Sequence, residues 1–256
     1  MTQRHSLEQE TKLETRSPEI IQAGSQHIRI SPWKSHDSSA LLTPLTAFEP
    51  IKSETILAGI EKSRSIGYKT IYTSALIESE TVAFVKLGFR LKEQLYVLQR
   101  TTAAAETAAR EKVRLKKPSE TDLTEVANLD KLCFDDFWTM DVNALLEAES
   151  ATSRSRFRIA TSKLAGNHEQ IVGYAITGLG NKKGYLQRLA VHPEFQSRGI
   201  GQLLVADGLE WLRFWRSNQI FVNTQIKNDK ALNFYLKIGF ILLHERLNIL
   251  EYELNS

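Results

Sequence analysis

Cysteine is almost absent from this chain of 256 residues, and its scarcity limits the sites that the chain can form. The single cysteine, Cys133, excludes an intramolecular disulfide bond and favours a reducing compartment. No group of histidine, cysteine and aspartate residues has the spacing typical of a metal site. We therefore expect no metal ion, and we interpret Cys133 as a core residue.

Long apolar runs are also lacking. No uncharged apolar stretch reaches the length of about 18 residues that a membrane-spanning helix needs. Residues 1–25 carry charges of both signs and no apolar block, which is not typical of a signal peptide. We therefore expect a cytoplasmic protein with no membrane partner.

Charge of one sign does not dominate either. Lysine and arginine number 33 and aspartate and glutamate 30, so the formal net charge is only +3, without long basic runs. This balance gives no support to a nucleic-acid partner, although it is compatible with a phosphate-rich ligand. Hydrophobic residues make up 42% of the chain, which is enough for one large core or two small ones.

The predicted elements follow the same order twice along the chain. Shifted along itself, the sequence aligns Val85–Phe89 with Leu236–Phe240, and Leu41–Pro44 with Ala190–Pro193. We therefore interpret the chain as a tandem duplication. The expected division is a disordered tail over 1–26, a first half over 27–100, a linker over 101–111 and a second half over 112–256.

Apolar periodicity predicts a mixed α/β (α+β) architecture for both halves. In the first half we expect strands over 27–30, 40–43, 70–74 and 94–99 and helices over 55–65 and 79–86. In the second half we expect strands over 113–116, 157–161, 170–178, 185–191, 220–224, 240–243 and 247–253. Helices are expected there over 122–132, 141–149 and 229–237, and from residue 200 onward.

The most informative stretch runs from Gly184 to Gly208 and is predicted to be a strand, a tight loop and a helix. The loop, Gln196–Gly201, has the sequence QSRGIG. Two glycines and an arginine at a helix N-terminus let backbone N–H groups approach an anion, which the helix dipole also favours. The alternative is that the glycines only shape a turn. The loop matches neither the triphosphate-binding nor the dinucleotide-binding glycine motif.

This loop resembles the acyl-CoA-binding loop of the GNAT acyl-CoA N-acyltransferases. A second stretch, Asn228–Phe240, resembles another motif of that family, and the resemblance covers roughly 113–254. It implies a GNAT fold for the second half, preceded by a partial, degenerate GNAT-like repeat. In that first half the opening strands of the family fold are expected to be missing.

The first half also lacks the residues that the two motifs supply. Pro50-Ile51-Lys52 stands where the second half has Gly199-Ile200-Gly201. Ile77 and Phe84 stand where the second half has Asn228 and Tyr235, and neither side chain can form a hydrogen bond. We therefore expect the first half to keep the scaffold without the chemistry.

The resemblance implies acetyl-CoA as acyl donor. The residues it assigns to binding this cofactor are Leu189, Ala190, Val191, Gln196, Ser197, Arg198, Gly199, Ile200, Gly201, Asn228 and Tyr235. It gives catalytic roles to the backbone N–H of Leu189, which would polarise the thioester carbonyl, and to Tyr235, which would protonate the leaving thiolate. The alternative for Tyr235 is an aromatic residue on the buried face of a helix.

The general base is left open. Several family members carry a glutamate on the strand before the loop, whereas this chain has no carboxylate over 184–188. A water relay through Gln187 is one alternative. Glu147, Glu194 and Glu245 are others, whereas His192 is interpreted as a turn residue.

The acceptor is expected to bind through Phe137, Trp138 and Asp141, because aromatic rings and carboxylates attract a cationic amine. The alternative is a packed loop with solvated aspartates. This stretch is similar to that of N-terminal alanine acetyltransferases and of the tandem mycothiol synthases. A small-molecule amine or a protein N-terminus is the expected acceptor.

Together these residues predict an N-acetyltransferase that moves the acetyl group of acetyl-CoA to a primary amine by direct attack in a ternary complex. The alternative, supported by the missing carboxylate, is a non-catalytic acyl-CoA-binding or interaction module. The identity of the amine, the preferred acyl chain and the oligomeric state stay open.

Overall fold

A computed structural model describes residues 18–34, 36–45, 49–103, 113–163 and 169–254. Its strands form one mixed sheet of 11 strands in the order β1-β2-β3-β4-β11-β5-β10-β9-β8-β7-β6. The strands are β1 (Glu19–Ala23), β2 (Gln26–Trp33), β3 (His36–Pro44), β4 (Thr70–Thr73), β5 (Arg90–Thr101), β6 (Arg114–Lys116), β7 (Arg154–Lys163), β8 (Glu169–Gly180), β9 (Lys183–Val191), β10 (Gln219–Gln225) and β11 (Ile241–Glu253). The helices are α1 (Ser53–Ile66), α2 (Glu78–Lys86), α3 (Leu123–Cys133), α4 (Val142–Ser150), α5 (Ile200–Phe214) and α6 (Asp229–Lys237).

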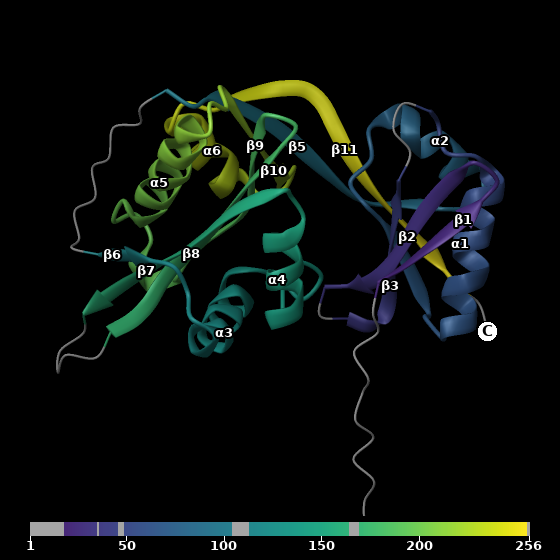
Figure 1. Cartoon of the computed structure of the whole chain (residues 1–256), viewed down its shortest axis with the longest axis horizontal. Helices are drawn as coiled ribbons and strands as arrows, with labels where there is room; N and C mark the ends of the chain where they lie inside the picture. Colours follow the sequence, from purple (N-terminus) through teal and green to yellow (C-terminus); the bar gives the residue numbers. More distant parts are fainter. Residues whose placement is uncertain (1–17, 35, 46–48, 104–112, 164–168, 255–256) are drawn as a thin grey trace, which may run out of the picture.

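The molecule has two lobes, with α1 and α2 in the first and α3 to α6 in the second (Figure 1). In the second lobe, α5 and α6 cover one face of the sheet and α3 and α4 the other. Helix α5 forms because Ile200, Leu204 and Leu212 recur at helical spacing and are all buried. The predicted GNAT-like order of strands and helices in this half is confirmed.

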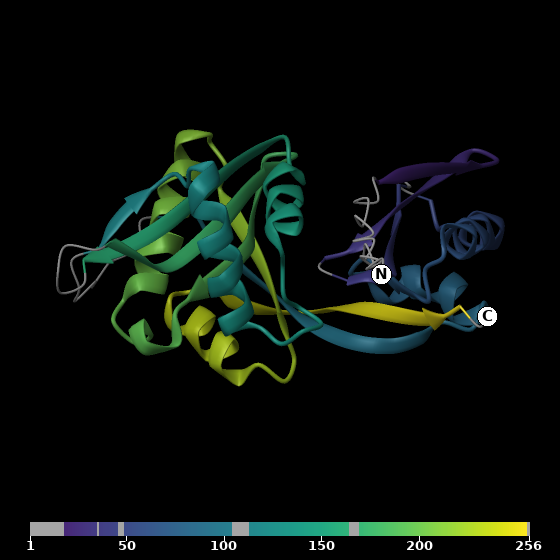
Figure 2. The same cartoon turned by 90° about the horizontal axis from the view of Figure 1, so that it is seen from below.

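Two long strands join the lobes and exchange partners between them (Figure 2). Strand β5 leaves the first half, and its residues Leu95–Thr101 pair with β10 of the second half. Strand β11 leaves the second half, and its residues Glu251–Glu253 pair with β4 of the first half. Each lobe therefore contains a strand segment supplied by the other.

Because of this exchange, the predicted linker at 101–111 does not separate two independent sheets. Thr101 still belongs to β5, and residues 104–112 lie outside the described residues. A fragment that starts at 113 would lack the strand that lies between β10 and β11. The two halves are thus repeats in sequence but not independent units in the sheet.

We expect the isolated fragment 113–256 to fail to fold cooperatively, because the edges of β10 and β11 would lose the ladder of β5. Circular dichroism during thermal unfolding is the measurement, with the full chain as control. Addition of the fragment 1–103 should restore the transition. A cooperative transition in the isolated fragment would contradict this expectation.

The predicted disordered tail over 1–26 is wrong for its last part. Residues 1–17 lie outside the described residues, but Glu19–Ala23 forms β1 and pairs antiparallel with β2. Gly24 makes the turn between them with a φ of 59°, in the left-handed region that glycine favours. Since Ile20 is 61% exposed, β1 depends on pairing rather than on burial, which is why its sequence gives a weak signal.

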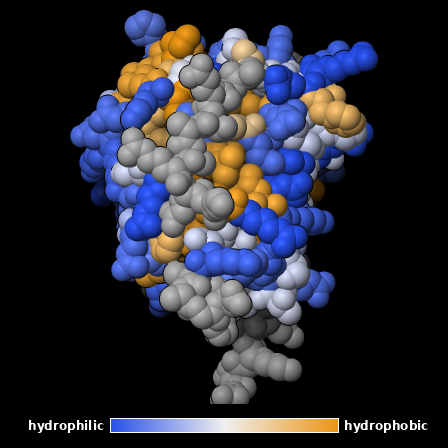
Figure 3. Space-filling view, turned by 90° about the vertical axis from the view of Figure 1, so that its left-hand side faces the viewer, coloured by the Kyte–Doolittle hydropathy of each residue, from blue (hydrophilic) through white to orange (hydrophobic). Residues whose placement is uncertain are grey.

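The first half keeps more of the repeat than expected. The hairpin of β1 and β2 precedes β3 as β7 and β8 precede β9, so only the counterparts of β6, α3 and α4 are missing from the described part. The described helices include none that is long and apolar enough to span a membrane. The end of the second lobe that faces the viewer in Figure 3 is largely hydrophilic around small apolar patches.

Candidate functional site

The site begins where β9 and β10 separate. These parallel strands pair only at Ile220 with Gly184 and at Phe221 with Tyr185, although both continue beyond these positions. The far side of β9 stays paired with β8 up to Val191. Among the described residues, the opposite backbone edge of β9, which includes Leu189, is therefore left without a strand partner. An extended ligand could add to this edge as a further strand.

A bulge in β9 lies at the same place. The register passes from Arg188 opposite Ile176 to Leu186 opposite Thr177, so Gln187 has no partner residue in β8. Bulges of this kind are frequent next to functional sites because they redirect a side chain. The Oε1 atom of Gln187 is buried, and no described residue forms a hydrogen bond with it.

The loop that follows β9 gives α5 an open N-terminus. Gly199 is its N-cap residue and has a φ of 87°, which a residue with a Cβ adopts only at a cost of about 1–2 kcal/mol. A Cβ at Gly201 would lie 3.2 Å from the Phe234 ring, so glycine also permits the close approach of α5 and α6. The first N–H groups of α5 thus face the groove, where the helix dipole favours an anion.

Side chains hold this loop against the end of β9. Gln196 Nε2 donates to the Val191 carbonyl at 2.9 Å, and Lys230 of α6 donates to Gln196 Oε1. Arg198 donates to the Glu194 carbonyl at 2.8 Å and lies 4.8 Å from the Phe195 ring centroid. The loop supplies one cation near the N-terminus of α5, Arg198, and α6 supplies a second, Lys230.

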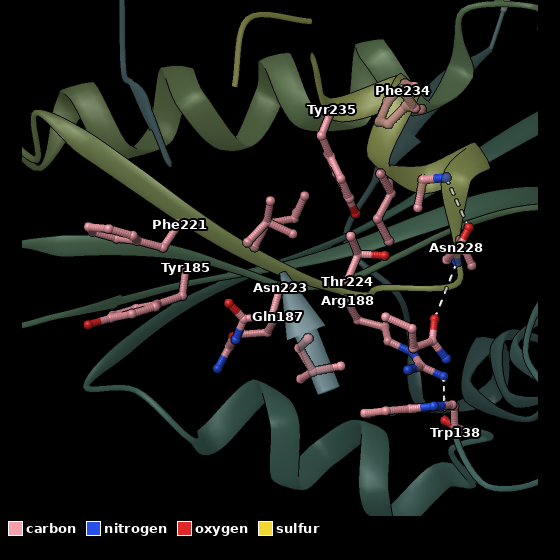
Figure 4. Close-up of a pocket in the computed structure, with 18 of the residues that line it drawn as sticks. Trp138, Tyr185, Gln187, Arg188, Phe221, Asn223, Thr224, Asn228, Phe234 and Tyr235 are labelled. Atoms are coloured by element: carbon pink, nitrogen blue, oxygen red, sulfur yellow. Dashed lines mark hydrogen bonds between the residues drawn. The ribbon is translucent and has the colours of Figure 1, made fainter. Parts of the chain in front are cut away.

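These features line one groove with a volume of about 2040 Å³. Every residue predicted to bind the cofactor is part of its wall: Leu189, Ala190, Val191, Gln196, Ser197, Arg198, Gly199, Ile200, Gly201, Asn228 and Tyr235. Figure 4 shows Tyr235 pointing from α6 into this groove, across from Arg188 and Trp138. The fold thus brings together residues that two separate motifs supply.

Asn228 and Tyr235 occupy the two ends of α6. Asn228 caps the helix, because its Oδ1 accepts from the Ala231 N–H at 3.0 Å. Tyr235 is 7% exposed, and burial raises the pKa of its phenol above the ordinary range, while the charge of Arg188 opposes this shift. The phenol therefore keeps its proton at neutral pH and can act as a donor.

A buried ionic network supports β9 from below the groove. Arg188 donates to both carboxylate oxygens of Asp130 at 2.8 Å, and Tyr174 donates to the same carboxylate. Arg188 also donates to the Trp138 carbonyl at 2.7 Å, and Asp130 accepts from the Met140 N–H at 2.7 Å. The sequence did not lead us to predict this network. The signal that could have indicated it is that Arg188 falls at an inward position of a strand and Asp130 at an inward position of a helix.

The candidates for the general base differ in their position relative to the groove. Gln187 and Glu245 line the groove, and Glu245 is exposed. Glu194 lies outside the lining residues, and Glu147 forms an ion pair with Arg29 of the first half. His192 accepts from the Glu194 N–H at 3.3 Å, as a turn residue does.

Two of the three residues predicted to bind the acceptor do not line the groove. Asp141 caps α4 by accepting from the Ala144 N–H at 2.8 Å. Phe137 packs between the lobes, with its ring centroid 4.8 Å from that of Trp33. Trp138 does line the groove. Asp141 is used as the N-cap of α4, and Phe137 is used in the contact between the lobes, so neither side chain lines the groove.

Residues of the first half also reach the groove. They include Trp33 and Lys34, at the turn between β2 and β3, as well as Ser74 and Ala75 after β4. Cys133 is only partly buried, lines the groove and donates to the Val191 carbonyl at 3.4 Å. Burial raises the pKa of its thiol to about 11.

The corresponding place in the first half is closed. Strands β3 and β4 pair over four successive positions, from Ser39 with Thr70 to Leu42 with Thr73, and do not separate as β9 and β10 do. The N-terminus of α1 is occupied by Gln26, whose Oε1 accepts from the Lys52 N–H at 2.8 Å. The described residues contain no cluster of three or more His, Cys, Asp or Glu side chains that could hold a metal ion.

Comparison with known proteins agrees with this geometry. Residues 123–240 match the model of the Acetyltransferase (GNAT) family. The chain is 25% identical over 232 residues to a mycothiol acetyltransferase of Nocardia farcinica, covering 80% of this chain and 76% of that protein. It is 29% identical over 58 residues to N-alpha-acetyltransferase 30 of Schizosaccharomyces pombe, covering 23% and 39% respectively.

One solved structure shares the fold over nearly the whole chain. It is a tandem GNAT protein from the clavulanic acid biosynthesis pathway, with a TM-score of 0.67 and 13% identity. The match covers 93% of this chain and 82% of that one. The two-lobed arrangement thus has a solved counterpart.

Proposed function

Because residues 123–240 match the model of the Acetyltransferase (GNAT) family, we propose that the chain moves the acetyl group of acetyl-CoA to a primary amine by direct attack in a ternary complex. The observation that carries this proposal is the separation of β9 from β10 beside the open N-terminus of α5. An extended amide-bearing arm fits the unpaired strand edge, and a pyrophosphate fits the helix terminus. The described residues of the first half offer neither feature.

The chain's own groups then have separate tasks. The loop Gln196–Gly201 and the first turn of α5 bind the phosphates, while the edge of β9 fixes the arm of the acyl donor. The backbone N–H of Leu189 donates to the carbonyl oxygen on which negative charge develops. Tyr235, kept protonated by burial, donates to the leaving sulfur. The acyl donor supplies only its activated thioester.

The acceptor enters on the side of Trp138 and the first lobe, where the groove continues to Trp33 and Lys34. A primary amine must lose a proton to attack, and a water held by Gln187 is the route we propose for it, since the Gln187 Oε1 is buried without a partner among the described residues. Two classes of amine remain in the proposal. The names of the relatives point to a small molecule for one and to a protein N-terminus for the other.

Binding is tested by calorimetric titration of acetyl-CoA into the full chain, for which we expect one equivalent, held by the second lobe. Gly199→Ala should weaken binding by about tenfold or more, because the left-handed turn at the phosphate site is strained. Gly239→Ala is the matched control, since Gly239 has a φ of 89° but does not line the groove. Two equivalents, or equal losses in both variants, would contradict this assignment.

Catalysis is tested by the release of free CoA thiol in the presence of small primary amines and of peptides with a free N-terminus. We expect release to depend on the amine and to saturate with both substrates, as a ternary complex requires. Binding of acetyl-CoA without transfer to any amine of the panel would favour the non-catalytic acyl-CoA-binding module instead.

A further inference from the structure

Lys34 is a buried amine with no role in the proposed reaction. It lies at the turn between β2 and β3 with a φ of 48°, a conformation that costs a residue other than glycine about 1 kcal/mol or more. Its Nζ is buried, and no described residue accepts a hydrogen bond from it. An amine left without partners inside a protein is costly, so the position calls for an explanation.

Aromatic rings from both lobes surround this amine. The Lys34 Nζ lies 3.7 Å from the ring centroid of Trp138, 4.2 Å from that of Trp33 and 5.6 Å from that of Phe137. Trp33 is fixed in turn, because its Nε1 donates to the Phe137 carbonyl at 3.0 Å. The turn between β2 and β3 of the first lobe therefore places the amine against the segment of the second lobe that borders the groove.

The surroundings favour the neutral amine. Burial lowers the pKa of Lys34 well below its ordinary value, and the charge of Arg188 lowers it further, against the carboxylates of Asp130 and Asp135. The faces of the rings attract an ammonium group, but they offer no proton acceptor. A neutral lysine amine carries a free lone pair and is a nucleophile.

This amine shares a groove with the proposed reaction centre. Lys34 lines the same groove as Leu189 and Tyr235. Arg188 links the two places: it donates to the Trp138 carbonyl at 2.7 Å, and it immediately precedes Leu189 in β9. Figure 4 shows Arg188 between Trp138 and Tyr235. The Nζ of Lys34 forms no hydrogen bond with a described residue, so no such bond opposes a change of rotamer within the groove.

We propose that Lys34 is an internal acetyl acceptor: the groove transfers one acetyl group from acetyl-CoA to the Nζ of Lys34. The Nζ forms a bond to the acetyl carbon, and the bond between that carbon and sulfur breaks. The electron pair leaves with the sulfur, which takes a proton and departs as free CoA thiol. Nζ loses a proton to solvent and becomes a neutral amide, which the aromatic cage holds without a charge to bury.

The inference rests on the proposed function, because it needs acetyl-CoA bound in this groove. The test is incubation of the full chain with acetyl-CoA and no added amine, followed by peptide mass spectrometry. We expect one acetyl group at Lys34 and one equivalent of released thiol. The rate should saturate with acetyl-CoA, fall when free CoA competes, and not depend on protein concentration.

Two variants complete the test. Lys34→Arg should remove the modification, whereas Lys92→Arg should leave it unchanged. Lys92 is the matched control because it approaches the same Phe137 ring, at 5.7 Å, but is paired with Glu251 at 3.0 Å. Lys34→Arg removes the nucleophilic amine, and Lys92→Arg keeps the cation that pairs with Glu251.

Each other outcome has one meaning. If calorimetry shows that acetyl-CoA binds and Lys34 stays unmodified, this inference alone falls. If acetyl-CoA does not bind at all, the proposed function falls with it. Labelling of Lys34 that increases linearly with acetyl-CoA and ignores free CoA would overturn the inference, because it would indicate ordinary chemical reactivity.

Discussion

Tyr235→Phe is expected to lower kcat by about 10²–10⁴-fold with the best amine of the panel, the usual contribution of a positioned acid. Acetyl-CoA binding should stay within about twofold of that of the unmodified chain, because the ring still packs against Phe234 and Phe240. The substitution removes only the hydroxyl that Figure 4 shows pointing into the groove. Steady-state kinetics and calorimetry together are the measurement.

The control is Tyr252→Phe, which removes a hydroxyl from β11 where that strand has crossed into the first lobe. Tyr252 packs against Phe89 with ring centroids 4.9 Å apart and does not line the groove. It should leave kcat unchanged. If Tyr235→Phe retained full turnover, the alternative interpretation of Tyr235 as a packed aromatic residue would be the correct one.

The parts of the site that the sequence predicts are those encoded within one strand, one loop and one helix. Leu186 and Ala190 alternate with less buried neighbours along β9, and Ile200, Leu204 and Leu212 mark the inner face of α5. Gly199 identifies the turn between the two elements because only glycine adopts its φ freely. Local spacing is enough to place these residues, so the end of the groove at the N-terminus of α5, the proposed phosphate site, follows from the sequence.

The parts that the sequence does not predict depend on contacts between distant residues. The exchange of β5 and β11 is invisible to periodicity, because a strand has the same pattern whichever lobe it pairs with. Asp141 shows the opposite problem. A carboxylate beside aromatic residues suggested a ligand site, yet the end of α4 uses it as a cap.

The position of Lys34 could not be predicted for both reasons: its neighbours are distant in the sequence, and its residue type indicates another environment. In the sequence it is one cation in a short turn, and such a residue is normally solvated. Only the docking of the two lobes places Trp138 over its amine, at 3.7 Å. The first lobe therefore does more than support the second, since it places a lysine amine in the groove.

The stability of that end depends on a pair that the motifs do not contain. Asp130 is fully buried and Arg188 is 7% exposed, and they are joined by two hydrogen bonds of 2.8 Å. Desolvation makes the net value of such a pair small, but removing one partner leaves the other charge buried and uncompensated. The effect of a single substitution should therefore exceed the contribution of the pair itself.

We expect Asp130→Ala to lower the free energy of unfolding by about 3–5 kcal/mol, measured by urea denaturation. Asp207→Ala is the matched control, since Asp207 also makes a two-bond contact with an arginine, Arg156, at 2.6 and 2.7 Å, but both side chains are partly exposed. It should cost about 1 kcal/mol or less.

The double substitution Asp130→Ala with Arg188→Met separates two contributions to that loss of stability. One is the uncompensated guanidinium of Arg188, and the other is the loss of the hydrogen bonds that Asp130 accepts. If the uncompensated guanidinium causes most of it, the double variant should be more stable than Asp130→Ala alone, because methionine fills part of the same space without a charge. Equal stability would instead assign the loss to the bonds that Asp130 makes with Tyr174 and with the Met140 N–H. In either case acetyl-CoA binding should weaken less than stability does, because Gly199 and the first turn of α5 lie on the opposite face of the sheet from α3.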